Sequence, residues 1–164
     1  MIIFKTIITK NLTNKNIKDI CDLKDAYWKF GLNSQINFFK KNVKMYDLHN
    51  CCFFKGQLIG YTLLKIRFFT IKNKKSKCIH FETLVINKKF RDKKIGNKLM
   101  LFNNDTIIAK KLIGFLICNK KMRFFYKKNL WKKADKKFNK INIFKTDYDL
   151  MTFNQKKSNL VKIY

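Results

Sequence analysis

A basic turn between an apolar run and a helical run is the part of this sequence best suited to binding phosphate. Residues 84–86 are apolar, residues 87–94 are mostly polar and basic, and residues 95–110 have the spacing of a helix. The first N–H groups of a helix have no internal acceptor and carry a positive partial charge, so they can bind a pyrophosphate. Gly96 permits close approach of the backbone, and three cations add charge: Arg91, Lys93 and Lys94. The alternative interpretation is a solvated loop that only caps the helix.

A second segment, residues 119–131, places polar and basic side chains among aromatic ones. It begins at Asn119, contains Phe125 and Tyr126 in succession, and ends at Trp131. Lysines interleaved with aromatic residues are also typical of proteins that stack on nucleic-acid bases. A non-enzymatic nucleic-acid-binding protein is therefore an alternative function, although the sequence has no helix-turn-helix, zinc-finger or RNP-like signature.

In the N-terminal half, the pattern predicts a strand, two helices and a hairpin. Residues 2–9 alternate as in a strand, and Thr13 or Asn14 can cap a helix over residues 17–30. Ser34 can cap the second helix. Residues 50–54 and 58–69 flank a short turn, as in a β-hairpin. The apolar faces expected for the two helices are Ile17, Ile20, Leu23 and Tyr27, and Ile36, Phe39, Val43 and Tyr46.

In the C-terminal half, we expect an exposed loop containing Lys72, Lys74, Lys75 and Lys77, followed by a strand over 78–86. A helix over 95–110, an apolar strand over 112–117, a helix over 119–128 and one or two strands within 131–153 complete the order. A strand–helix–strand unit normally forms two parallel strands with a right-handed crossover, whereas the hairpin is antiparallel. The predicted fold is α/β, with a mixed sheet and helices on both faces. No linker or repeat divides the chain, so we expect a single domain over residues 1–164.

The charge of +28 comes almost wholly from lysine, and it decides little about function. The lysines are spread along the chain, which also has no proline and many Asn, Ile and Phe residues. Codon bias in an A/T-rich genome produces such a composition without selection for a partner. The field would still attract polyanions, including nucleic acid, acidic membranes and phosphorylated cofactors.

Hydropathy and cysteine spacing argue against membrane-spanning, secreted and zinc-binding classes. No apolar run reaches the roughly 18 residues that a membrane span needs. The five cysteines form no CxxC pair and are odd in number, which disfavours a disulfide framework and a zinc site. We expect reduced, buried thiols, a cytoplasmic location and no bound metal.

The order and spacing of the two segments resemble the GNAT superfamily of acetyl-CoA-dependent N-acetyltransferases. The turn from Phe90 to Gly96 resembles that family's aromatic-Arg/Gln-x-x-Gly-x-Gly turn, with Lys94 in place of the first glycine. Residues 119–131 resemble Asn-x-x-Ala-x-x-Phe-Tyr-x-x-x-Gly-Phe, with Met122 for alanine and Leu130 for glycine. The hairpin at residues 53–61 is similar to the family's second and third strands. The resemblance therefore covers most of the chain.

The resemblance implies a single GNAT-like domain whose mostly antiparallel sheet contains one parallel, splayed pair of strands. It implies a site for acetyl-CoA between Leu84 and Tyr126, with backbone groups of one strand along the pantetheine arm and the basic turn on the pyrophosphate. The cofactor-binding residues carried over are Val85, Ile86, Arg91, Asp92, Lys93, Lys94, Ile95, Gly96, Asn97, Asn119 and Tyr126.

The resemblance also implies direct transfer of an acetyl group to a primary amine within a ternary complex. Tyr126 matches the family's usual proton donor to the leaving thiolate, because a phenol of pKa about 10 stays protonated near neutrality. The alternative role of Tyr126 is aromatic packing. Glu82 is our preferred base and His80 the second candidate, on the strand before the turn. Many members of the family use no dedicated base.

The sequence leaves open the identity of the acceptor. It also leaves open two other functions, a nucleic-acid-binding protein and a catalytically silent binding module. In the family the acceptor site is formed by the first helices, the hairpin region and the final loop. Scarce acidic residues in both terminal regions could attract a cationic amine or form a solvated face: Asp19, Asp22, Asp25, Asp147 and Asp149. The departures at Lys94 and Leu130 also allow a catalytically silent binding module. The protein could act as a monomer or a homodimer.

Overall fold

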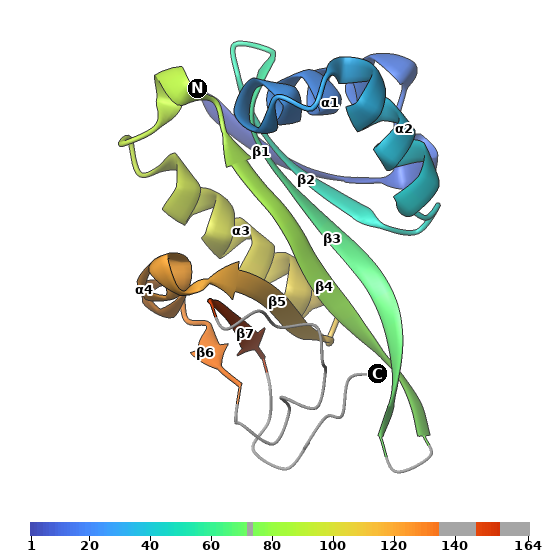
Figure 1. Ribbon diagram of the computed structural model, residues 1–164, viewed down its shortest axis with the longest axis vertical. Helices are drawn as coiled ribbons and strands as arrows, with labels where there is room; N and C mark the ends of the chain where they lie inside the picture. Colours follow the sequence, from blue (N-terminus) through green and yellow to red (C-terminus); the bar gives the residue numbers. More distant parts are fainter. Residues whose placement is uncertain (72–73, 135–146, 155–164) are drawn as a thin grey trace. The chain divides into compact units, whose positions relative to one another are not determined.

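The computed structural model describes residues 1–71, 74–134 and 147–154, and the order of its elements agrees with the sequence prediction (Figure 1). Short 3₁₀ turns lie at Thr9–Asn11, Lys88–Phe90 and Lys120–Met122. The helices are α1 (Asn14–Trp28), α2 (Leu32–Asn42), α3 (Ile95–Ala109) and α4 (Arg123–Lys128). The strands are β1 (Ile2–Ile8), β2 (Leu48–Phe54), β3 (Gln57–Ile71), β4 (Lys74–Ile86), β5 (Ile113–Asn119), β6 (Lys132–Lys133) and β7 (Tyr148–Phe153).

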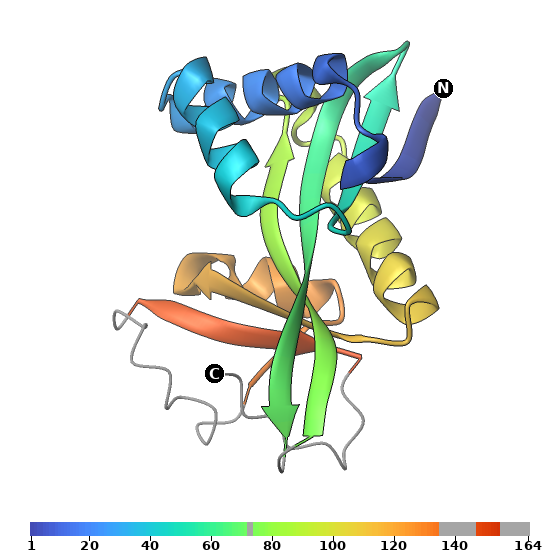
Figure 2. The ribbon, with the colours of Figure 1, turned by 90° about the vertical axis from the view of Figure 1, so that its right-hand side faces the viewer.

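The strands form one mixed sheet in the order β1-β2-β3-β4-β5-β7-β6. Figures 1 and 2 show the ribbon from two directions. The β1–β2, β2–β3, β5–β7 and β6–β7 pairs are antiparallel. The β4–β5 pair is parallel and runs from Cys78 opposite Ile113 to His80 opposite Phe115. The mixed sheet and the parallel strand–helix–strand segment predicted from the sequence are therefore confirmed.

The chain divides into two compact units, which we describe separately. Unit 1 contains residues 1–65 and 82–103, and unit 2 contains residues 66–81 and 104–164. Strands β3 and β4 and helix α3 contribute residues to both units. Unit 1 therefore holds the basic turn and the start of α3, whereas unit 2 holds the aromatic segment that ends at Trp131.

Helix α1 begins as predicted but buries a different face. The Thr13 side chain accepts a hydrogen bond from the Asn16 N–H, and the Asn16 side chain bonds the Thr13 N–H in return, so a capping box starts the helix. Ile20 and Leu23 are buried as expected. Tyr27, however, is 54% exposed, and Lys24 takes its place on the buried face. The apolar stripe is therefore shifted by one position from the predicted one.

Helix α2 begins three residues earlier than the Ser34 cap would place it. Its N-cap is Gly31, whose φ of 85° is a conformation that glycine adopts freely. The Asp25 carboxylate accepts a hydrogen bond from the Gly31 N–H at 2.7 Å, which fixes the turn between the two helices. Ser34 consequently lies inside the first turn, and Tyr46 lies beyond the helix and is exposed. Phe39 is buried as predicted.

The β2–β3 hairpin turns at Lys55 and Gly56, and both residues have positive φ.

Unit 1 also buries His49, which takes part in a chain of hydrogen bonds. The Thr9 hydroxyl donates to the Asp47 carbonyl, so its oxygen accepts from His49 Nε2 at 2.8 Å. His49 Nδ1 then accepts from the Tyr61 hydroxyl at 2.8 Å. Burial lowers the pKa of His49 to about 4, so the ring is neutral.

Strand β4 is longer than the sequence suggested. It begins at Lys74, so the prediction of a lysine loop was wrong for Lys74, Lys75 and Lys77, while Lys72 lies outside the described residues. Continued backbone pairing in a long hairpin outweighs the preference of lysine for loops. Thr83 interrupts the strand with a φ of 60°. The regular alternation expected from His80 to Ile86 is therefore broken at Thr83.

Unit 2 is organised around Trp131, which is fully buried. Its indole N–H donates to Asn104 at 2.9 Å, and the Asn104 amide donates in turn to the Asn129 carbonyl at 3.0 Å. Phe81 packs edge-on against the indole, with ring centroids 5.4 Å apart. The basic loop expected between the final strands falls on residues 135–146, outside the described part of the chain.

All five cysteines are buried and reduced, as the sequence analysis expected. Burial is the main cause that raises the pKa of each thiol. The values are about 12 for Cys51 and Cys78 and about 11 for Cys52 and Cys118, and the shift of Cys21 is in the same direction.

Candidate active site

The end of β4 and the turn after it hold the first part of the candidate cofactor site, within unit 1. Val85 is buried in the core, and Ile86 is half-buried. The Ile86 carbonyl accepts a hydrogen bond from Arg91 Nε at 3.2 Å. The Arg91 guanidinium also lies 5.1 Å from the centre of the Tyr27 ring. Arg91 is therefore folded back onto its own unit, where its charge stays close to the turn.

Lys94 stands where the resembled turn has its first glycine, and it adopts a backbone conformation that glycine adopts freely. Asp92 and Lys94 have φ values of 60° and 58°, which lie in the left-handed region. A lysine in this region costs about 1 kcal/mol more than a glycine would. The Lys94 carbonyl accepts from the Lys98 N–H at 3.1 Å, the first hydrogen bond of α3. Lys94 thus supplies the conformation of the missing glycine and adds a charge.

The start of α3 offers amide donors and no acidic side chain, a combination that suits an anion. The N–H groups of Ile95 and Gly96 belong to the first helical turn, whose amides have no acceptor within the helix. The first turn of α3 contains no acidic residue. Lys93 and Lys94 are exposed immediately before it, beside the single carboxylate of Asp92. Helix dipole and lysine charge therefore act in the same direction on a bound anion.

In unit 2, Asn119 and Tyr126 frame the short helical segment after β5. The Asn119 side chain accepts a hydrogen bond from the Lys121 N–H at 2.9 Å and so caps the 3₁₀ turn. Tyr126 is 8% exposed, and its ring meets Phe81 and Phe125 edge-on, with centroids 6.1 and 5.3 Å apart. Burial, with a smaller contribution from Cys118, raises the pKa of the Tyr126 phenol well above 10. The phenol is therefore protonated over the whole physiological range.

The two candidate bases have different surroundings. His80, in unit 2, stacks face to face on Phe115, with centroids 4.6 Å apart and ring planes 3° from parallel. Glu82, in unit 1, is half-buried and forms an ion pair with the buried Lys65. The structure thus gives Glu82 a charged partner that the sequence analysis did not foresee.

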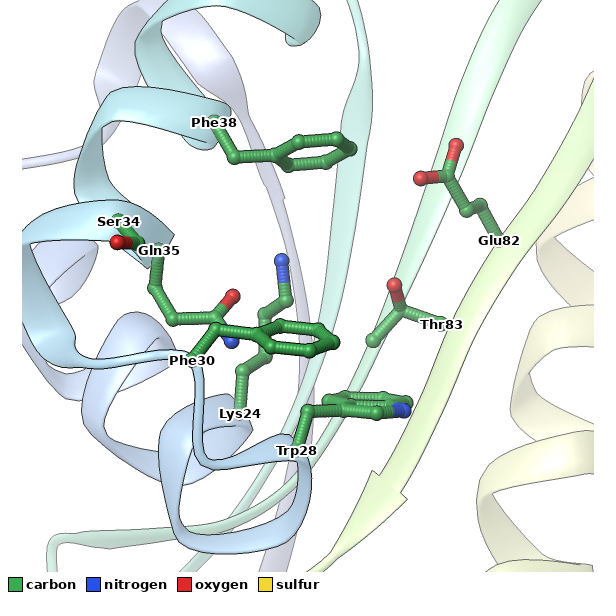
Figure 3. A pocket seen from close by; sticks show the side chains of 8 residues that line it. All are labelled: Lys24, Trp28, Phe30, Ser34, Gln35, Phe38, Glu82 and Thr83. Carbon is green, nitrogen blue, oxygen red and sulfur yellow. The ribbon is translucent and has the colours of Figure 1, made fainter.

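Glu82 also lines a pocket of about 320 Å³ within unit 1, shown in Figure 3. Helices α1 and α2 and their connection supply most of its wall, and β4 supplies Glu82 and Thr83. The volume is at the lower end of the range for small-molecule sites. The remaining lining residues, which the sequence analysis had not singled out together, are Lys24, Trp28, Phe30, Ser34, Gln35 and Phe38.

Most of the acidic residues considered as attractors for a cationic amine are already partnered. Asp19 and Asp22 form i,i+4 ion pairs with Lys15 and Lys18, as on a solvated helix face. Asp25 accepts from the Gly31 N–H. Asp149 is buried in ion pairs with two cations of unit 2, Arg123 and Lys133. The solvated or structural interpretation therefore holds for these four carboxylates.

Comparisons with solved structures agree with the sheet and its helices. An acyl-CoA N-acyltransferase from Pseudomonas aeruginosa aligns with a TM-score of 0.69 at 12% identity, over 93% of this chain and 99% of that one. The PaiA N-acetyltransferase from Thermoplasma acidophilum, in complex with coenzyme A, aligns with a TM-score of 0.59 at 18% identity, over 93% and 98%. Glucosamine-6-phosphate N-acetyltransferase from Arabidopsis thaliana aligns with a TM-score of 0.62 at 18% identity, over 87% and 97%. At these identities the likeness concerns the fold.

The sequence itself matches a family model over residues 18–130, described as the acetyltransferase (GNAT) family. The comparison with curated proteins gave no match. Among the helices of the described residues, none combines the length and apolar character needed to cross a membrane. The family match spans more than half of the chain and includes the turn from Phe90 to Gly96 and residues 119–130 of the second segment. The chain therefore belongs to the acetyltransferase (GNAT) family and is an acyltransferase whose acyl donor is acetyl-CoA.

Proposed function

We propose that this protein transfers the acetyl group of acetyl-CoA directly to a primary amine, in a ternary complex and without a covalent enzyme intermediate. The observation that carries the proposal is the turn before α3. It keeps two left-handed residues, an acid-free helix start and exposed lysines, although Lys94 replaces a glycine. A turn preserved in this way supports a working cofactor site over a silent module.

The proposed cofactor contacts follow from the groups available in each unit. In unit 1, the N–H groups at the start of α3 would bind the pyrophosphate, with Lys93 and Lys94 beside them. The backbone of β4 would bind the pantetheine arm. In unit 2, Asn119 and Tyr126 are proposed to contact the cofactor. The full proposed set is Val85, Ile86, Arg91, Asp92, Lys93, Lys94, Ile95, Gly96, Asn97, Asn119 and Tyr126.

When bound, the thioester supplies an electrophilic carbonyl carbon. The amine nitrogen forms a C–N bond to this carbon, the C–S bond breaks, and the sulfur keeps the electron pair. Tyr126 is proposed to give its proton to the departing sulfur, and a base takes one proton from the nitrogen. The products are an N-acetylated amine and CoA with a free thiol. The base releases its proton to solvent, and Tyr126 regains one from solvent.

Glu82 is our proposed base, acting directly or through a water molecule. Its support is position: Glu82 lines the pocket of unit 1, whereas His80 is stacked on Phe115. The Lys65 ammonium holds the carboxylate in a defined orientation. Glu82→Gln should therefore lower the rate more than His80→Gln, and the difference should shrink at high pH, where the amine is already neutral.

Thermal unfolding with acetyl-CoA tests the cofactor part of the proposal. Ligand at about 100 times its dissociation constant contributes about 2.7 kcal/mol, enough to raise the melting temperature by several degrees. ATP at the same concentration is the polyanion control, and Gly96→Val is the variant expected to lose the effect. An equal shift with ATP, or none with acetyl-CoA, would refute the cofactor site. Mass spectrometry of a panel of primary amines then tests the transfer.

We also propose that the two units form one domain over residues 1–164, because β3, β4 and α3 contribute to both. Unfolding by urea should then show a single transition by fluorescence and by circular dichroism. A cytoplasmic location is proposed from the five free thiols and is tested by cell fractionation.

A further inference from the structure

The pocket beside Glu82 contains polar groups that its own walls do not satisfy. In Figure 3, Lys24 and Gln35 come from the helices, while Glu82 and Thr83 come from the facing strand β4. Three aromatic side chains, Trp28, Phe30 and Phe38, form the apolar part of the wall. All of these residues belong to unit 1.

Gln35 is the first of these groups. The residue is only 4% exposed. Within the described part of the chain, its Nε2 is the one buried side-chain nitrogen or oxygen without a hydrogen-bond partner. A buried donor without an acceptor costs about 1–3 kcal/mol, and native proteins keep few of them. A hydrogen-bond acceptor on a molecule bound in the pocket would satisfy this amide.

Lys24 is the second group. It is 8% exposed, and no carboxylate of the described residues lies within ion-pair distance of its ammonium. Its Nζ lies 5.1 Å from the centre of the Phe38 ring. Burial lowers the pKa of Lys24, and the nearby Lys65 acts in the same direction while Glu82 opposes it. A buried ammonium without a counter-ion is unusual, because buried charges are normally paired.

The charges of the pocket sum to one uncompensated positive charge. Glu82 is neutralised by its ion pair with Lys65, and Lys24 is left over. A single carboxylate matches this charge, whereas a phosphate would bring about two negative charges close to Glu82. The small volume and the aromatic walls limit the rest of the ligand to a compact apolar body.

We propose that this pocket binds the amine acceptor by its carboxylate, so that the substrate class is a small primary amine carrying a carboxylate and an apolar or aromatic group. Lys24 and Gln35 donate to the carboxylate oxygens. Trp28, Phe30 and Phe38 hold the apolar group. Glu82 and Thr83 accept from the ammonium on the opposite side. The inference rests on the proposed function and names the acceptor for it.

Paired probes test the inference, and each pair differs only by the carboxylate. L-phenylalanine is compared with phenethylamine, and L-leucine with isopentylamine, by calorimetric binding to the full chain and by acetylation. We expect the carboxylate member of each pair to bind at least tenfold more tightly. Equal or tighter binding of the amine without a carboxylate in both pairs would overturn the inference.

Variants assign the effect to the two side chains. Lys24→Met and Gln35→Leu keep the size of each side chain and remove its donor, and Lys40→Met is the matched control on the exposed face of α2. The carboxylate preference should fall at least tenfold in Lys24→Met and severalfold in Gln35→Leu, and it should not change in Lys40→Met. Circular dichroism of each variant checks folding, and a preference unchanged in folded Lys24→Met and Gln35→Leu would contradict the assignment.

The thermal shift with acetyl-CoA separates the two possible failures. A specific shift together with acetylation of amines that lack a carboxylate would remove the proposed acceptor class and leave the acetyltransferase function in place. Carboxylate-dependent binding without a shift by acetyl-CoA would remove the proposed function and leave the carboxylate site in place.

Discussion

There is no room for a methyl group at Gly60 of β3. Gly60→Ala therefore tests the packing against Ile86 of β4, the strand that is proposed to bind the pantetheine arm. A Cβ atom at this position would lie 2.9 Å from Ile86 Cδ1, 3.2 Å from Cys52 Cβ and 3.4 Å from Leu99 Cδ2. Ordinary contacts between carbon atoms are about 3.5–4.0 Å long. The first contact can relax, because Cδ1 is the end of a flexible side chain. The second cannot relax easily, because Cβ is fixed to the backbone.

We expect Gly60→Ala to lower the free energy of unfolding by about 2 kcal/mol, within the range of about 1–3 kcal/mol for overpacked cores. For a chain of this size, the melting temperature should fall by roughly 4–8 °C. Urea denaturation followed by circular dichroism gives the free energy directly. The Michaelis constant for acetyl-CoA should rise as well, because the new methyl group displaces Ile86.

A second substitution isolates the cause. Ile86→Val removes Cδ1 and alone should cost about 1 kcal/mol. If the contact with Cδ1 dominates, the double variant should be more stable than the sum of the two single changes predicts, by at least about 1 kcal/mol. Additive effects within about 0.5 kcal/mol would assign the cost to the fixed contact with Cys52 Cβ, whereas an unchanged free energy of unfolding in Gly60→Ala would refute the reasoning.

Three further predictions concern charge and catalysis. Between pH about 6.5 and 4 the unfolded chain binds one more proton than the folded chain at His49, so acidification over this window should lower the free energy of unfolding by about 3 kcal/mol. Urea denaturation of His49→Gln should show a flatter pH profile. Lys94→Gly and Lys94→Ala remove the same charge, so both should weaken acetyl-CoA binding about two- to fivefold in calorimetry. The glycine variant should be about 1 kcal/mol more stable than the alanine variant, and equal stability of the two would argue against backbone strain at this position. Tyr126→Phe should lower turnover about 100-fold in single-turnover assays while the dissociation constant of acetyl-CoA stays within twofold, and unchanged turnover would exclude the acid role.

Local patterns were predictable because their causes lie within a few residues. The turn from Phe90 to Gly96 is one example, since its aromatic residue, cations and glycine are all contained in the seven residues that form it. The capping box at Thr13 and the hairpin turn at Gly56 are others. Each depends on hydrogen bonds or backbone angles of near neighbours, which the sequence states directly.

Features that depend on tertiary packing were missed or misplaced. The rule that lysine lies outside and tyrosine inside put Tyr27 on the buried face of α1, but Tyr27 is exposed and Lys24 is buried beside Phe38 of α2. The cap of α2 was assigned to Ser34 because serine is a good cap, whereas the sharp turn after α1 requires a positive φ that Gly31 provides. The pocket lined by Glu82 could not be predicted, because Lys24 and Glu82 are far apart in the sequence and line one pocket only in the folded chain.

Because the cysteines are buried, the release of the CoA thiol by this enzyme can be measured with a thiol reagent. Thiols attack aromatic disulfide reagents as thiolates, and the five protein thiols are shielded and have raised pKa values. The CoA thiol released at each turnover is neither shielded by the protein nor raised in pKa. The absorbance that such a reagent produces should therefore report the CoA released by the native protein, without a contribution from the protein thiols. The same reagent should detect five more equivalents when the chain is unfolded, so one chromophore reports both acetyl transfer and the fraction of folded enzyme.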